Sequence, residues 1–252
     1  MDSILQKYNL LTEKYQTIEV ESLKFDIQDR RNIIQQIFSL LSALKIDAAK
    51  VKNGKKAIQL FEKLRDVQSQ LRILENAQLN PELISYLSVL KEKELQLKWK
   101  IQRFTKKKKI EFPEIKKKSK INKSKTLSKI NKILEKLDSK VHSSFIDYPE
   151  NVHKLRTLFL KFLYHVEILS YLDTVDNAKL EKLKLYQNQL GEIHDYEILM
   201  QDIARYFMKR EWYEDKNIAI FEQEQNTLYE TFIYNVEGFI GECKAVTQLS
   251  KM

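Results

Sequence analysis

The sequence is poor in the residues that break or cross-link a chain. Its 252 residues include a single cysteine, Cys243, which excludes an intramolecular disulfide and fits a reducing compartment. Only three prolines and four glycines are present, and this scarcity predicts long helices joined by few turns. No run of 18 apolar residues occurs, and residues 1–4 do not resemble the start of a signal peptide. We therefore expect a cytoplasmic protein without a membrane span.

The patterns that mark common catalytic and metal centres are also missing. The four histidines and one cysteine do not have the spacing of zinc ligands. A Glu-x-x-His motif occurs once, from Glu150 to His153, whereas di-metal centres in helical bundles need two such motifs on different helices. Neither a glycine-rich phosphate loop nor a Gly-x-Ser-x-Gly elbow occurs. We therefore expect no enzymatic activity, no cofactor and no metal site.

Apolar residues recur at helical spacing along almost the whole chain, which predicts an all-α fold. The expected helices cover residues 3–18, 23–45, 55–77, 81–104, 130–141, 150–172, 177–207 and 215–249. We expect Ser3 to cap the first helix. Asn80 and Pro81 are expected to begin the fourth, because Asn caps helices and Pro suits their first position. Two late glycines, Gly238 and Gly241, are expected to bend the last helix.

The positive charge is concentrated in one stretch. The whole chain carries a formal net charge of +9, yet residues 105–132 hold twelve lysines against two acidic residues, so the remainder is close to neutral. The lysine segment, residues 105–125, contains the runs Lys106–Lys109 and Lys116–Lys118. Three interpretations stay open: a solvated linker, a surface for capturing polyphosphate, or a contact with nucleic acid or an anionic membrane. Because only Phe112 interrupts these lysines, the segment by itself offers no stacking platform for single strands.

Two short pieces of the second half carry the candidate chemistry. His153 and Arg156 lie three residues apart, so they share one helix face and can contact a single anion. His194 and Asp195 follow Gly191 within one helical turn, and we expect His194 to be a second anion contact oriented by the Asp195 carboxylate. A glycine inside a helix costs about 1 kcal/mol and points to close approach of a neighbouring helix or ligand. One turn joins the two helices, so we expect His153 and His194 to lie close together. The alternatives are a capping histidine at 153 and a buried His194–Asp195 pair that fixes helix packing.

Both pieces resemble the motifs of a known family. Residues 152–156, Val-His-Lys-Leu-Arg, followed by Lys161, Tyr164 and Glu167, are similar to the second-half motif of CHAD domains, the conserved histidine α-helical domains. Residues 190–195, Leu-Gly-Glu-Ile-His-Asp, are similar to the next motif of that family. The resemblance implies two similar four-helix halves that bind inorganic polyphosphate through basic side chains without catalysing a reaction.

The two halves of the chain also align with each other. Residues 27–31 align with 152–156 at an offset of 125, and residues 64–69 align with 190–195 at an offset of 126. Agreement within one residue indicates a degenerate duplication of a four-helix unit. We therefore expect two pseudo-equivalent antiparallel four-helix halves within one helical domain. The expected boundaries are 1–104 for the first half, 105–125 for the lysine-rich linker and 126–252 for the second half.

The expected function is non-catalytic binding of a linear polyanion, and the resemblance names inorganic polyphosphate. The second-half site would comprise His153, Lys154, Arg156, Lys161 and His194, with Gln28, Arg31 and Gln68 as a weaker first-half counterpart. Nucleic acid is a less favoured partner. Two alternatives stay open. One is a helical scaffold that has lost the ligand, which Leu158, Leu160 and Leu163 favour. The other is a histidine phosphotransfer module built on His153 and Arg156.

Overall fold

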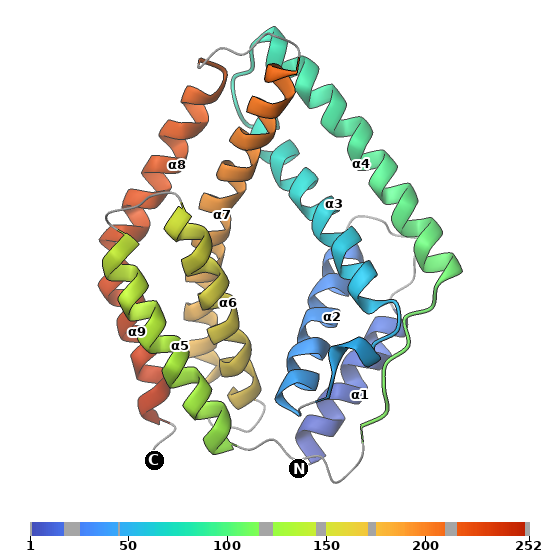
Figure 1. Ribbon diagram of the computed structural model, residues 1–252, viewed down its shortest axis with the longest axis vertical. Helices are drawn as coiled ribbons and strands as arrows, with labels where there is room; N and C mark the ends of the chain where they lie inside the picture. Colours follow the sequence, from blue (N-terminus) through green and yellow to red (C-terminus); the bar gives the residue numbers. More distant parts are fainter. Residues whose placement is uncertain are drawn as a thin grey trace. The chain divides into compact units, whose positions relative to one another are not determined.

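The computed structural model describes residues 2–17, 26–44, 46–115, 123–144, 150–170, 175–209 and 216–249. Within these ranges the structure is helical and contains no β-strand, which confirms the all-α prediction (Figure 1). The elements are α1 (Asp2–Thr17), α2 (Asp26–Ala43), η1 (Ala48–Lys50), α3 (Gly54–Glu75), α4 (Pro81–Lys107), α5 (Lys123–Ser144), α6 (Glu150–Ser170), α7 (Asn177–Met208), α8 (Lys216–Tyr234) and α9 (Val236–Leu249). No helix in the described ranges is long and apolar enough to cross a membrane.

Of the two helix caps predicted from the sequence, the structure contains the one at Asn80 and lacks the one at Ser3. At α4 the side-chain Oδ1 of Asn80 accepts a hydrogen bond from the backbone N–H of Leu83 at 2.9 Å, with Pro81 in the first helical position. This confirms the predicted start, because the amide oxygen satisfies a backbone donor that the helix itself leaves free. At α1 the helix already includes Asp2, so Ser3 lies inside the helix and the predicted cap is wrong.

The last predicted helix is divided into α8 and α9 at Asn235, not at the glycines. The Asn235 amide nitrogen donates a side-chain hydrogen bond to the Thr231 carbonyl at 2.8 Å, and its backbone N–H bonds the Phe232 carbonyl at 3.1 Å. These short-range bonds compete with the regular helical ladder and end α8. Gly238 lies beyond this break, in α9. A Cβ there would stand 3.3 Å from the Tyr186 hydroxyl, so this glycine leaves room for a neighbouring side chain.

The chain forms two compact units whose limits differ from the predicted halves. The first unit comprises residues 1–68 and 90–126, and the second comprises residues 69–89 and 127–252. The structure thus groups the end of α3 and the start of α4, residues 69–89, with the second unit. The equivalence of two four-helix halves stays a prediction.

Polar contacts attach residues 69–89 to α7. The Ser69 hydroxyl donates a hydrogen bond to the buried carboxylate of Asp195. One position later, the fully buried Gln70 amide donates to the Asp202 carboxylate at 2.9 Å and accepts from the Tyr86 hydroxyl at 2.9 Å. Because buried polar groups are costly when unsatisfied, this network fixes how residues 69–89 lie against α7 within the second unit.

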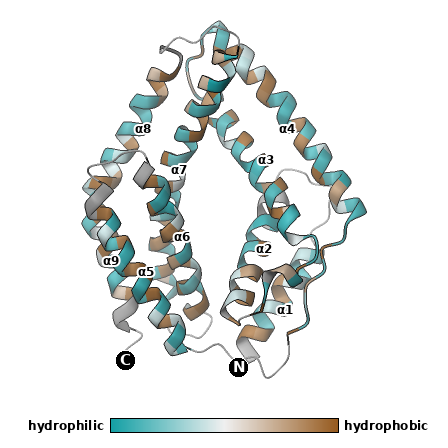
Figure 2. Cartoon of the chain, in the orientation of Figure 1, coloured by the Kyte–Doolittle hydropathy of each residue, from teal (hydrophilic) through white to brown (hydrophobic). Residues whose placement is uncertain are grey.

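The core of the second unit is built from aromatic side chains of α6 and α9. Phe159 and Phe162 of α6 and Phe239 of α9 are fully buried, and Leu183 and Leu190 of α7 close the same cluster. This arrangement explains why α6 is apolar on most sides and identifies it as a buried central helix. Other helices are amphipathic, and Figure 2 shows hydrophilic and hydrophobic residues alternating around α3 and α4.

The described part of the lysine segment is attached to the first unit, which contradicts its interpretation as a solvated linker. Glu111 forms an isolated antiparallel bridge with Lys52, with backbone N···O distances of 3.1 and 3.4 Å. Their side chains form an exposed ion pair at 3.2 Å. Between this bridge and the end of α4, Ile110 is buried. The buried Ile110 and the paired backbone hold the chain in place.

Two tyrosines of α1 continue this attachment. The Tyr8 hydroxyl donates a hydrogen bond to the Pro113 carbonyl at 2.6 Å. The Phe112 ring meets Tyr15 edge to face, with centroids 5.4 Å apart. Residues 108–115 therefore form an extended strap on the first unit, whereas residues 105–107 end α4 and residues 123–125 begin α5. For the rest of the segment the linker stays a prediction. Residues 116–122 lie outside the described ranges.

Candidate anion-binding site

Helices α6 and α7 bring the two motif histidines together. The ring centroids of His153 and His194 are 5.0 Å apart, with 46° between the ring planes. His153 is exposed near the start of α6, whereas His194 is only 9% exposed. The prediction that these residues lie close in space is confirmed. Two neighbouring imidazoles, one open to solvent, form the nucleus of the candidate site.

The carboxylate beside His194 is Glu197, one helical turn later, and not Asp195 as the motif implied. His194 Nδ1 lies 3.2 Å from Glu197 Oε2, and both side chains are largely buried. Asp195 instead receives the Ser69 hydroxyl from α3. The reason is geometric: consecutive residues project about 100° apart on a helix, while residues three apart share a face. Asp195 therefore serves helix packing, and Glu197 orients the His194 ring.

The surroundings of His153 lower the pKa of its imidazole and so favour the neutral ring. Desolvation by partial burial is the main cause that lowers the pKa of His153, and the nearby His194 and Arg156 lower it further. Glu197 opposes these effects. A neutral imidazole next to other cations is the state expected without a counterion. An anion bound here would supply that counterion and favour protonation of the ring.

The basic residues of the motif share α6 with His153. Lys154 and Lys161 are exposed, and Arg156 is half-buried. Arg156 is close enough to lower the pKa of His153, whereas Lys154 projects about 100° away from it and Lys161 lies about 12 Å further along the helix. The site thus offers one exposed imidazole, two exposed ammonium groups and a guanidinium.

The three leucines that favoured a scaffold have a structural role. Leu163 is buried in the core of the second unit, and Leu158 packs against that core from a half-buried position. Leu160 is half-buried as well. A cation at position 163 would have to enter an apolar core, which is costly without a partner. At positions 158 and 163 the leucines therefore contribute to packing of the second unit.

The predicted first-half counterpart, Gln28, Arg31 and Gln68, belongs to the first unit. The Gln68 amide donates a hydrogen bond to Glu94 at 3.0 Å, so this donor is already satisfied. Arg31 is half-buried on α2. The side chain of Gln28, also on α2, lies outside the described residues.

Gly191 does not mark the close approach that its position in a helix indicated. A Cβ at this residue would meet nothing within 4 Å apart from its own helix and chain neighbours. The prediction of a neighbouring backbone or side chain against Gly191 is therefore wrong. No contact described in the structure explains the glycine.

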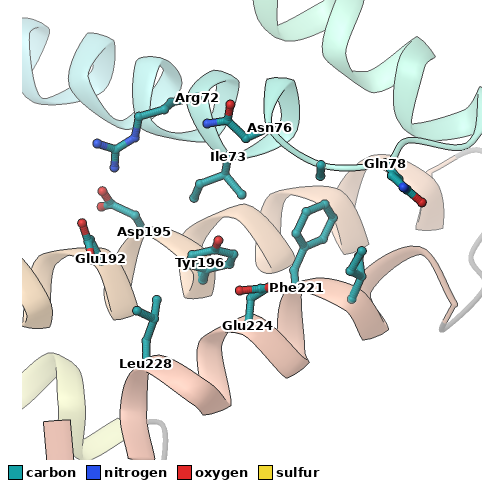
Figure 3. Close-up of a pocket in the computed structure, with 12 residues that line it drawn as sticks. Arg72, Ile73, Asn76, Gln78, Glu192, Asp195, Tyr196, Phe221, Glu224 and Leu228 are labelled. Atoms are coloured by element: carbon teal, nitrogen blue, oxygen red, sulfur yellow. The ribbon is translucent and has the colours of Figure 1, made fainter. Parts of the chain in front are cut away.

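Another face of α7 borders a cleft of about 550 Å³ within the second unit. Its walls come from the end of α3 and the following turn, from α7 and from α8 (Figure 3). Three carboxylates line it, and Figure 3 shows Arg72 on the α3 side facing Glu192 and Asp195 across the cleft. The lining residues are Arg72, Ile73, Asn76, Ala77, Gln78, Glu192, Asp195, Tyr196, Ile220, Phe221, Glu224 and Leu228.

This cleft is unsuited to a polyanion. Glu192, Asp195 and Glu224 outnumber Arg72, and Glu224 and Glu192 help to raise the pKa of the Tyr196 hydroxyl after burial has done most of it. Negative charge that disfavours a tyrosinate also disfavours a phosphate. Among the described residues no group of three or more His, Cys, Asp or Glu side chains could hold a metal ion. The exposed side of His153 is therefore the better place for an anion.

Comparison with family models, curated proteins and solved structures found no match to this chain.

Glu197 and Ser69 could not be singled out from the sequence. Glu197 is one of 35 acidic residues, and its importance depends on the ring orientation of His194. Ser69 did carry a signal, because it aligns with Asp195 at an offset of 126 and the two residues form a hydrogen bond.

Proposed function

We propose that the protein binds a linear polyanion, inorganic polyphosphate in the first instance, where the exposed start of α6 meets the middle of α7, without making or breaking a covalent bond. The observation that carries this proposal is the pairing of exposed His153 with His194 at 5.0 Å, beside two exposed lysines. The resemblance of both motifs to CHAD domains supports the choice of polyphosphate. The binding residues would be His153, Lys154, Arg156, Lys161 and His194.

The different burial of the two histidines assigns them different roles in binding. His194 is held by Glu197, so it presents a fixed ring against which His153 can be positioned. His153, Lys154 and Lys161 are open to solvent and would meet the phosphates directly. Each charge-assisted hydrogen bond contributes roughly 1.5–3 kcal/mol, so three or four such contacts suffice for measurable affinity. Glu197 offsets part of the positive charge, which makes repeated phosphates a better ligand than a single phosphate ion.

The first prediction concerns charge and salt. Arg156→Gln and Lys161→Gln should each weaken polyphosphate binding about tenfold or more, because each removes one charge-assisted contact. The affinity of the native protein should fall steeply between low and physiological salt, since bound phosphates displace counterions. Calorimetric titration with polyphosphate at two salt concentrations measures both effects. Lys136→Gln, an exposed lysine of α5 in the same unit, is the matched control and should change little. Absence of binding by the native protein at low salt would leave a helical scaffold without this ligand.

The second prediction concerns pH. Polyphosphate binding should strengthen as the pH falls toward the lowered pKa of His153 in the free protein, because bound phosphates favour the charged form of its ring. The gain should develop between the pKa of His153 in the complex, which bound phosphates raise, and its lowered pKa in the free protein, and should level off below the latter. His153→Gln should remove this dependence while retaining the salt dependence. Equal pH profiles for the native protein and the variant would show that His153 does not touch the ligand.

A further inference from the structure

The first unit carries a separate concentration of cations, here called the lysine patch. It is formed by two stretches, residues 50–56 around the start of α3 and residues 103–109 at the end of α4. Its members are exposed: Lys50, Lys52, Lys55, Lys56, Arg103, Lys106, Lys107, Lys108 and Lys109. Neither stretch contains an acidic residue. The acidic residues just outside them are Asp47 and Glu111, and Glu111 is paired with Lys52. The patch is therefore strongly positive.

Contacts in the structure bring the two stretches together. The side-chain amide of Asn53 donates to the Lys109 carbonyl at 2.9 Å, and Lys52 pairs with Glu111 through the backbone bridge. Lys56 Nζ lies 5.9 Å from the centre of the Phe104 ring, so the first turn of α3 faces the last turn of α4. Lysines that are distant in sequence thus share one surface.

The backbone under the patch is tightly built. Asn53 has φ 62°, in the left-handed region, which Asn adopts more readily than most residues. A Cβ at Gly54 would stand 2.5 Å from Val51 Cγ1, so only glycine fits at this turn. The turn aims the Asn53 side chain at the strap and sets the position of Lys55 and Lys56. The lysines are therefore presented by a fixed framework and not by a loose tail.

This arrangement works against stability when nothing is bound. Lys55 and Lys56 occupy the first turn of α3, which holds no acidic residue, although the helix dipole favours negative charge there. They also face further lysines at the end of α4. Lysines that are placed unfavourably for stability, with no nearby acidic residue to offset their charge, indicate a functional surface.

An exposed aromatic residue lies next to the patch. Trp99 of α4 is 60% exposed, and the Arg103 guanidinium carbon lies 5.4 Å from the centre of its ring. Trp99, Arg103 and Lys106 share one helix face, and about 10 Å of helix separates the first from the last. The aromatic rings nearer the lysines, Phe104 and Phe112, are only half-buried, and Phe112 packs edge to face on Tyr15, so neither presents an open ring face comparable to that of Trp99. Trp99 is thus the ring that can receive a ligand.

We propose that the lysine patch and Trp99 bind single-stranded nucleic acid, with the lysines on successive phosphates and a base stacked on Trp99. Lysines provide attraction without base selectivity, and an indole with a guanidinium beside it accepts any base. The guanidinium over the ring gives this face a polar character that suits a nucleotide better than a lipid chain. The proposal is independent of the histidine site, because none of its residues belongs to that site.

The test uses the full chain and a fluorescently labelled oligothymidylate of about 12 nucleotides, a length within the usual site size. Lys55→Gln/Lys56→Gln and Lys107→Gln/Lys108→Gln should each lower the affinity about tenfold or more at low salt. Each should also reduce the slope of log affinity against log salt by about 1.4, or 0.7 per lost phosphate contact. Trp99→Ala should weaken binding about fivefold or more. Lys132→Gln/Lys136→Gln removes two exposed lysines of α5 and serves as the charge-matched control.

Fluorescence separates a stacked base from simple attraction. In a Trp212→Phe background Trp99 is the sole tryptophan, and the oligonucleotide should quench its emission, whereas polyphosphate, which has no bases, should not. Arg156→Gln should leave oligonucleotide affinity unchanged. The proposal is overturned if Trp99→Ala binds normally and no quenching occurs, which would indicate a general polyanion surface. It is also overturned if the oligonucleotide fails to bind while anionic phosphatidylserine vesicles bind and shift the Trp99 emission to the blue.

Discussion

Replacement of Phe239 by alanine is expected to remove about 3–5 kcal/mol of stability, a large part of the 5–15 kcal/mol that natural domains possess. The Phe239 side chain is 0% exposed. Its ring contacts Phe159, Tyr186 and Phe232, with centroids 4.8, 5.2 and 5.6 Å away. The substitution removes the apolar surface of the ring and leaves a cavity between α6, α7 and α9. Chemical denaturation followed by far-ultraviolet circular dichroism measures the loss.

Tyr234 provides the matched control for this experiment. It lies five residues earlier, at the end of α8, and is 90% exposed. Tyr234→Ala should change the free energy of unfolding by less than about 0.5 kcal/mol, because an exposed ring loses little on truncation. If Phe239→Ala and Tyr234→Ala had equal effects, α9 would not pack on α6 and α7 as described.

The second large effect is expected at the hydrogen bond between Ser69 and Asp195. Ser69→Ala should cost about 1.5–3 kcal/mol, because it removes a donor to a carboxylate that is only 5% exposed. Ser88→Ala is the control: Ser88 is exposed on α4, and its hydroxyl bonds only the Ile84 carbonyl of its own helix. That substitution should fall within about 0.5 kcal/mol of the native protein.

A double-mutant cycle distinguishes this bond from unrelated packing effects. The combined loss in Ser69→Ala/Asp195→Ala should be smaller than the summed losses of the two single variants, because either substitution alone already breaks the bond. Urea unfolding of the four proteins provides the values. Strict additivity would contradict a direct contact between these two side chains.

The fold class was predictable because it depends on local signals. Four glycines, three prolines and sustained helical periodicity require no knowledge of distant contacts. The same holds for the Asn80–Pro81 start of α4, where cap and first turn are adjacent in sequence. The break at Asn235 was not predictable in this way. It depends on which of several polar side chains bonds a backbone carbonyl. In the sequence alone, the glycines are the stronger indication of a helix break.

The candidate site was predictable in position and not in detail. Two helices joined by one turn place His153 beside His194, and spacing alone suffices for that inference. Spacing does not tell which neighbouring carboxylate reaches the His194 ring. The sequence predicts Asp195 in this role, and the structure shows Glu197 in contact with the ring. Likewise the strap at residues 108–115 is held by Tyr8, Tyr15 and Lys52, which lie about 59 to 105 residues away in sequence. Contacts of that range leave no trace in a local pattern.

The assignment of residues 69–89 to the second unit means that neither unit is a continuous piece of chain. The polypeptide passes from one unit to the other after Gln68, after Val89 and after Thr126. A single cut in the lysine segment would therefore yield an N-terminal fragment that carries the hairpin away from its partners on α7. The complementary fragment would lose the donors supplied by Ser69 and Gln70. Neither unit can therefore be excised from the protein as one continuous segment of chain.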